Sequence, residues 1–229
     1  MPIPKQAGFA SFLYFGMAGR SPINGKGVEI VSDHYYSNRP SAAHDRKTVE
    51  VELRGKKVRL VTDAGVFSKS GLDYGSRVLI DALDFPAGAS VLDVGCGYGP
   101  IGIAAGIMGA SSITMLDVNE RAVELAGENA AANGIAQAKA MQSDLLEAVS
   151  QQSFDVIISN PPIRAGKETV HRLFDQAYGC LNPNGALWIV IQKKQGAPSA
   201  KAKLDLLFDR VEEVTKDKGY RIYKAVKGS

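Results

Sequence analysis

The chain of 229 residues has little of what marks several classes of protein. Its two cysteines are too few for a disulfide-rich fold. No apolar run reaches the roughly 20 residues that a membrane-spanning helix needs. The net charge is only +3 and hydrophobic residues make up 45% of the chain, which excludes a wholly disordered protein. We therefore expect a globular protein of the reducing cytoplasm, built around one large domain.

The amino terminus differs from the rest of the chain. Residues 7–18 (AGFASFLYFGMA) are apolar and follow a single lysine, Lys5. The run is too short to cross a bilayer, although it has the length of the apolar part of a secretion signal. A secretion signal usually has several basic residues before its apolar part, and here there is only one. We therefore expect residues 1–31 to be an N-terminal extension and residues 32–229 to form the folded domain. A secretion signal is the alternative.

Charge is distributed unevenly along the sequence. Residues 1–66 carry a net charge of +4, residues 67–162 carry −7 and residues 163–229 carry +6. Basic flanks around an acidic middle are typical of a protein that binds a polyanion, although solvated lysines on surface helices would give the same pattern. The three histidines lie far apart without the spacing of metal ligands, so no metal site is predicted.

Hydrophobic periodicity predicts an α/β fold. Alternating residues around an Arg-Gly-Lys turn predict a small antiparallel sheet at 47–53 and 57–62. Beyond it, we expect strands at 89–94, 112–117, 139–142, 154–159, 186–192, 211–215 and 220–226, and helices at 72–84, 100–109, 119–132, 167–180 and 198–208. This alternation predicts a doubly wound, mostly parallel seven-stranded sheet. The last two strands are joined too closely for a crossover, so they should form an antiparallel hairpin at its edge.

A glycine-rich loop follows the first strand of this sheet. Asp93 lies near the end of the strand, and the run GCGYGP follows at 95–100. Ligands of doubly wound sheets bind at this edge, where glycines let the backbone approach closely. The run is a poor dinucleotide fingerprint because Pro100 stands where the last glycine belongs, so an NAD-dependent dehydrogenase is the weakest alternative. An acidic residue would repel a pyrophosphate and suits a cationic nucleoside, S-adenosylmethionine (SAM).

The run VLDVGCGYG at 91–99 resembles the first motif of the class I SAM-dependent methyltransferases. The resemblance implies that Asp117, at the end of the second strand, holds the ribose hydroxyls of SAM. It also implies that Ser143 and Asp144, after the third strand, contact the adenine. The residues that we expect to bind the cofactor here are Asp93, Gly95, Gly97, Gly99, Asp117, Asn119, Ser143 and Asp144.

The fourth strand ends at the tetrad Asn160-Pro161-Pro162-Ile163. Two prolines fix the backbone, and they hold Asn160 at the sheet edge beside the expected methyl donor, so we expect Asn160 to contact the cofactor as well. An exocyclic amine on a base or an amide is a poor nucleophile because its lone pair is delocalised. Acceptors on its two hydrogens keep that lone pair aimed, and the Asn160 side-chain oxygen and the Pro161 carbonyl are the candidates. The tetrad therefore predicts catalysis of N-methylation.

The tetrad resembles the [N/D]-P-P-[aromatic] motif of methyltransferases that act on planar nitrogens of adenine, guanine or glutamine. The chain departs from the motif at Ile163, where the ring that stacks on the target base is expected. Stacking is worth about 1–3 kcal/mol per base. Either Ile163 gives a weaker apolar platform or another ring replaces it, with Phe67 and Tyr98 as candidates.

Three further stretches, 34–45, 65–83 and 160–167, resemble the ribosomal RNA small-subunit methyltransferase C family. Its members methylate the exocyclic N2 of a guanine in 16S rRNA, and the resemblance covers roughly residues 33–227. It implies that the segment with Phe67, Asp73 and Gly75 lies over the cofactor. The expected partner is ribosomal RNA or the small ribosomal subunit, and no membrane.

Four basic residues follow the carboxyl ends of two central strands: Arg164, Lys167, Lys193 and Lys194. We expect them to contact rRNA phosphates, since they share this edge with Asn160, although solvated loop lysines are the alternative. Three other functions stay open. They are the same chemistry on DNA adenine or protein glutamine, a non-catalytic RNA-binding protein of this fold, and a small-molecule methyltransferase.

Overall fold

A computed structural model of the chain describes residues 43–68 and 71–229. The expected extension 1–31, with its apolar run, and most of the stretch 34–45 lie outside the described residues. All described residues belong to one compact unit. Within them, no helix combines the length and the apolar character that crossing a membrane requires.

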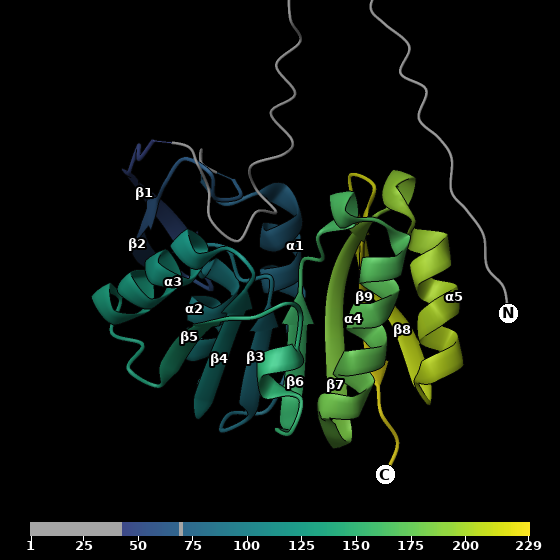
Figure 1. Cartoon of the computed structure of the whole chain (residues 1–229). Coiled ribbons are helices and arrows are strands. Elements are labelled where there is room, and N and C mark those ends of the chain that lie inside the picture. Colours follow the sequence, from purple (N-terminus) through teal and green to yellow (C-terminus); the bar gives the residue numbers. More distant parts are fainter. Residues whose placement is uncertain (1–42, 69–70) are drawn as a thin grey trace, which may run out of the picture. The chain divides into compact units, whose positions relative to one another are not determined.

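A seven-stranded sheet with the order β5-β4-β3-β6-β7-β9-β8 forms the centre of the fold (Figure 1). Its strands are β3 (Ser90–Val94), β4 (Ser112–Asp117), β5 (Ala138–Gln142), β6 (Phe154–Ser159), β7 (Leu181–Gln192), β8 (Arg210–Asp217) and β9 (Tyr220–Val226). Strands β5 to β7 in this order pair in parallel, whereas β9 pairs antiparallel with both β7 and β8. The predicted doubly wound sheet and its antiparallel terminal hairpin are confirmed.

Helices cover both faces of the sheet. On one face pack α1 (Tyr74–Ala82), α2 (Pro100–Ile107) and α3 (Glu120–Ala132), and on the other α4 (Lys167–Cys180) and α5 (Ala197–Leu207). The side chains of the central strand β7 explain why both faces are covered. Trp188 and Val190 join the core under the first three helices, while Leu187 and Ile189 join the core under α4 and α5. A strand that is apolar on both sides must be covered on both sides.

The predicted two-stranded antiparallel sheet is also present, as β1 (Lys47–Leu53) and β2 (Lys56–Thr62). The buried amide of Asn129 on α3 fastens this sheet to the domain. Its oxygen accepts the Val61 N–H at 2.7 Å, and its nitrogen donates to the Val61 carbonyl at 2.9 Å. The same nitrogen donates to the Tyr98 carbonyl at 2.8 Å, so one side chain connects the small sheet to the glycine-rich loop.

Three short 3-10 helices were not predicted: η1 (Glu147–Val149), η2 (Ile163–Ala165) and η3 (Lys193–Gln195). The last two matter for the site. Helix η3 follows β7 directly, and η2 begins within the proline tetrad that follows β6. Strand β7 also begins earlier than expected, because Phe154 of β6 already pairs with Leu181. An irregularity then shifts the register, so that Val156 pairs with Ala186.

Candidate active site

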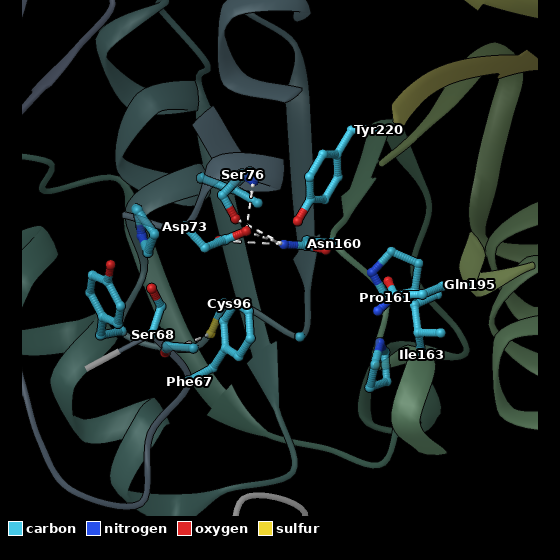
Figure 2. A pocket seen from close by; sticks show the side chains of 16 residues that line it. Phe67, Ser68, Asp73, Ser76, Cys96, Asn160, Pro161, Ile163, Gln195 and Tyr220 are labelled. Atoms are coloured by element: carbon cyan, nitrogen blue, oxygen red, sulfur yellow. Dashed lines mark hydrogen bonds between the residues drawn. The ribbon is translucent and has the colours of Figure 1, made fainter. Parts of the chain in front are cut away.

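Two cavities lie at the carboxyl edge of the sheet and share Gly95 and Pro162 as lining residues. The larger, of about 440 Å³, is called the tetrad cavity because Asn160, Pro161, Pro162 and Ile163 line it (Figure 2). The smaller, of about 250 Å³, is called the acidic cavity because Asp117 and Asp144 line it. The shared residues join the glycine-rich loop to the proline tetrad.

Every second residue at the start of the glycine-rich loop is a glycine, so the loop carries few side chains. Gly95, Gly97 and Gly99 have φ of 75°, 55° and 94°, in the left-handed region that glycine adopts without strain. The Gly95 N–H donates to the Leu116 carbonyl at 2.8 Å, which ties the loop to β4. Gly99 lines neither cavity. A Cβ there would lie 3.2 Å from the Ala126 Cα, so this glycine serves the packing of α3.

Asp117 presents its carboxylate at the acidic cavity, although the residue is only 5% exposed. One oxygen accepts the Asn119 N–H and the other accepts the Gly97 N–H, each at 2.9 Å. Burial raises the pKa of this carboxyl above its ordinary value. A carboxylate has about four acceptor positions, so two remain for the neighbouring hydroxyls of a ribose. These free acceptor positions fit the ribose of SAM.

Ser143 and Asp144 also line the acidic cavity. The Asp144 carboxylate pairs with Arg172 at 2.7 Å, and the Ser143 hydroxyl accepts the Ala148 N–H at 3.1 Å. Asn119 lines neither cavity. It is fully buried, caps α3 and donates its side-chain N–H to the Gly65 carbonyl at 2.8 Å, so it supports the segment that leads to Phe67.

Asp93, expected to bind the cofactor, lies behind the glycine-rich loop and lines neither cavity. It is fully buried, and one oxygen accepts the Gly102 N–H of α2 at 2.9 Å. The other oxygen has no hydrogen-bond partner among the described residues. Burial, partly opposed by the Gly102 hydrogen bond and reinforced by the charge of Asp117, raises the Asp93 pKa to about 7. The side chain therefore favours a neutral carboxyl in the interior.

This burial predicts a pH dependence of stability. The folded-state pKa is raised from 3.8 to about 7, so the native state retains a proton that the unfolded chain releases. The contribution of protonated Asp93 to the free energy of unfolding is complete below about pH 4 and is lost as the pH rises to about 7. Asp93→Asn mimics the neutral form. Between pH 5 and pH 8 we expect the wild type to lose about 1–3 kcal/mol in free energy of unfolding relative to this variant. Urea titrations of both proteins would test this, and parallel pH profiles would contradict it.

The proline tetrad brings Asn160 to the tetrad cavity with its side chain anchored. The amide nitrogen donates to the Ser76 hydroxyl at 3.0 Å and to the Asp73 carboxylate at 3.3 Å. The Pro161 carbonyl accepts the Ile163 N–H at 2.8 Å, which occupies one of its two lone pairs. Figure 2 shows Asn160 and Ser76 meeting beside Asp73. The Asn160 oxygen and one Pro161 lone pair are thus the acceptors left for an amine.

Three rings line the tetrad cavity, and sequence reasoning missed one of them. Phe67 is 44% exposed, whereas Tyr98 is 2% exposed, and its hydroxyl has no hydrogen-bond partner within the described part of the chain. The missed ring is Tyr220 of β9, which points toward Asn160 in Figure 2. Gly75 makes room for it, because a Cβ at this glycine would lie 2.9 Å from the Tyr220 ring.

The basic residues lie around the same edge. Lys193 and Lys194 are exposed on η3, and the Lys193 N–H donates to the Gly219 carbonyl at 2.7 Å, which ties η3 to the β8–β9 turn. Lys167 is exposed at the start of α4. Arg164 lies in η2, next to Ile163. All four follow β6 or β7, as expected.

Comparisons with known proteins agree with this geometry. The family model described as "Methyltransferase small domain" matches residues 57–224. Protein YbxB of Bacillus subtilis, described as uncharacterized, is 53% identical over 200 residues, which are 86% of this chain and 100% of YbxB. The ribosomal RNA small subunit methyltransferase C of Hamiltonella defensa is 33% identical over 74% of this chain and 51% of its own length. The large subunit methyltransferase G of Pseudomonas putida is 33% identical over 98% and 60%.

Among solved structures, the Thermus thermophilus 16S rRNA N2-guanine methyltransferase RsmC, in complex with AdoMet and guanosine, matches with a TM-score of 0.72 and 25% identity. The match covers 82% of this chain and 52% of RsmC. The chain thus spans about half the length of the rRNA methyltransferases that it resembles and the whole of YbxB. It belongs to the methyltransferase small domain family and is a SAM-dependent methyltransferase with a fold like that of RsmC.

Proposed function

We propose that the protein transfers a methyl group from SAM to the exocyclic N2 of a guanine in small-subunit ribosomal RNA. The observation that carries this proposal is the junction of the two cavities at Gly95 and Pro162. A nucleoside held by Asp117 in the acidic cavity would extend over the glycine-rich loop toward Asn160. The proline tetrad then stands where a planar amine would meet the methyl donor.

The residues of the chain would bind SAM and orient the amine of the substrate. Asp117 would hold the ribose, Ser143 and Asp144 the adenine, and Gly95 and Gly97 the methionine portion. Bound SAM supplies an electrophilic methyl group on a positively charged sulfur. The Asn160 oxygen and the free lone pair of the Pro161 carbonyl would accept hydrogen bonds from the two N–H groups of the amine, which keeps the nitrogen lone pair aimed at the methyl group. The nitrogen would then release one of these protons to water. Such a reaction depends on orientation more than on acid–base catalysis.

The choice of guanine in rRNA rests on relatives and on the surface. The similar proteins include both small-subunit and large-subunit rRNA methyltransferases, so the large subunit is the second candidate substrate. Exposed Lys167, Lys193 and Lys194 would bind phosphates. Tyr220 or Ile163 would contact the flipped base, in the place of the usual motif ring. We expect the protein to work in the cytoplasm, where ribosomes are assembled.

Transfer of a labelled methyl group from SAM tests the proposal. Unmodified small subunits, large subunits, naked 16S rRNA, duplex DNA and a protein extract would be offered in parallel. Label recovered as N2-methylguanine from small-subunit rRNA is the expected result. Label in large-subunit rRNA alone would change the substrate, and label only in DNA or protein would reject rRNA. SAM binding without any transfer would point to a binding protein of this fold.

The lysines of η3 give a separate prediction about RNA. Each phosphate contact contributes about 0.7–0.9 to the slope of log affinity against log salt concentration, so Lys193→Ala with Lys194→Ala should lower that slope by about 1.5. SAM affinity should not change. A matched control is Lys56→Ala with Lys57→Ala, another exposed pair of adjacent lysines, on the small sheet. Filter binding of 16S rRNA fragments between low and moderate salt would measure the slopes. Equal slopes for all three proteins would remove η3 from the RNA-binding surface.

A further inference from the structure

The Asn160 amide nitrogen is held by two residues that lie more than 80 positions earlier in the chain. It is 3.0 Å from the Ser76 hydroxyl, 3.3 Å from one Asp73 oxygen and 3.5 Å from the other. We infer that Asp73 and Ser76 are positioning residues, which orient the Asn160 amide so that its oxygen faces the amine of the substrate. The inference deepens the proposed function and rests on it, and it differs from the contact with SAM that family resemblance implies for Asp73.

The chemistry of a carboxylate determines the orientation. An ionised carboxylate accepts hydrogen bonds and cannot donate them, whereas an amide has one face that donates and one that accepts. Asn160 can therefore present only its nitrogen to Asp73. Its oxygen must turn away from α1, and Asn160 lines the tetrad cavity. Without Asp73 the two orientations of the amide would differ little in energy, and one of them places a donor against the amine.

Asp73 is itself rigidly held. It is the N-cap of α1, where its side chain accepts the Ser76 N–H at 3.2 Å. Ser76 is 4% exposed and belongs to the first turn of the same helix. Both partners of the Asn160 nitrogen thus come from one helix start, so they move as a unit. The N-cap hydrogen bond fixes the start of α1, so Asp73 and Ser76 can hold the Asn160 side chain in one orientation.

Asp73→Asn would reverse the orientation without removing the cap. Asparagine caps helices about as well as aspartate, and its oxygen would continue to accept the Ser76 N–H. That oxygen also lies 3.3 Å from the Asn160 nitrogen, so the new nitrogen would replace the other oxygen, which lies 3.5 Å away. An N–H donor would then lie beside the Asn160 amide nitrogen, which favours the opposite orientation of the amide, with its nitrogen toward the substrate. We expect kcat to fall about 100-fold, the loss typical of a misplaced reacting group, with SAM affinity unchanged.

An exchange of the two side chains provides the decisive test. Asn160→Asp alone opposes two carboxylates and should also lose about 100-fold in kcat. The double variant, Asp73→Asn with Asn160→Asp, restores one donor facing one acceptor and leaves a carboxylate oxygen for the amine. We expect its kcat to recover to within about tenfold of the wild type, which is strong non-additivity. If the losses in kcat of the two single variants multiply in the double variant, the inference is overturned. A loss of SAM affinity in Asp73→Asn would also overturn it.

A second measurement is independent of the acceptor. The side-chain NH₂ signals of Asn160 are assigned by NMR through their absence in Asn160→Asp. In the wild type they should be shielded from solvent exchange by Asp73 and Ser76, and in Asp73→Asn they should exchange faster. Unchanged signals would reject the positioning role even if rRNA is methylated. Changed signals in a protein that does not methylate rRNA would reject the proposed function and leave the orientation of Asn160 intact.

Discussion

Asn160→Ala should abolish methyl transfer while SAM still binds. The substitution removes the oxygen that would accept an amine hydrogen and leaves the glycine-rich loop and Asp117 untouched. Loss of one preorganised hydrogen-bonding group commonly costs about 100- to 1,000-fold in kcat. We therefore expect turnover to fall by at least about 100-fold. Single-turnover transfer and calorimetric titration with SAM would measure the two quantities separately.

Asn182→Ala is a matched control for this variant. Asn182 also donates a side-chain hydrogen bond, to Asp155 at 2.8 Å, but it lines neither the tetrad cavity nor the acidic cavity. It should retain the wild-type kcat, so that a loss confined to Asn160→Ala is a property of the site. Full turnover in Asn160→Ala would reject the tetrad mechanism.

Asp117→Ala should act on binding rather than on transfer. Two ribose hydroxyls on an ionised acceptor are worth about 1.5–3 kcal/mol each, so the loss of both predicts a SAM dissociation constant at least about 100-fold higher. The substitution also releases the Gly97 and Asn119 N–H groups, which adds to the loss. Isothermal titration with SAM gives the dissociation constant directly, and near-wild-type kcat is expected at saturating SAM.

Asp144→Ala separates the role of Asp117 from the general charge of the acidic cavity. Asp144 lines the same cavity, but its carboxylate is about half exposed and already pairs with Arg172. Because interactions of exposed charges are weak, we expect less than about a tenfold change in SAM affinity. Similar losses in both variants would show that the cavity binds by charge alone, and would remove the specific role of Asp117.

The parts of the site that are local in sequence were predictable. The loop glycines and the proline tetrad follow strands and Asp117 ends one, and parallel strands bring their carboxyl ends to one edge. Strand alternation also explains Asp93, whose location was not anticipated. Val91, two residues before it, faces the core under α1 to α3, so the Asp93 side chain lies on that face of the sheet, against α2.

Tyr220 and the partners of Asn160 could not be found in this way. Tyr220 reaches the tetrad cavity because β9 pairs antiparallel with β7, with Tyr220 opposite Gln192. The contact of Asp73 with Asn160 joins residues 87 positions apart. Such contacts depend on the strand register and on the packing of α1 against the sheet, which no local pattern encodes. They appear only when the whole sheet is assembled.

The contact between Gly75 and the Tyr220 ring has an evolutionary consequence. Any side chain at position 75 would meet that ring, which lies 2.9 Å from the place of a Cβ. A mutation at one position therefore alters which residues the other tolerates. Within the family, these two positions should change together, with a larger residue at 75 only where 220 has lost its ring. In relatives that carry a different pair at positions 75 and 220, the tetrad cavity would also present a different surface to the substrate.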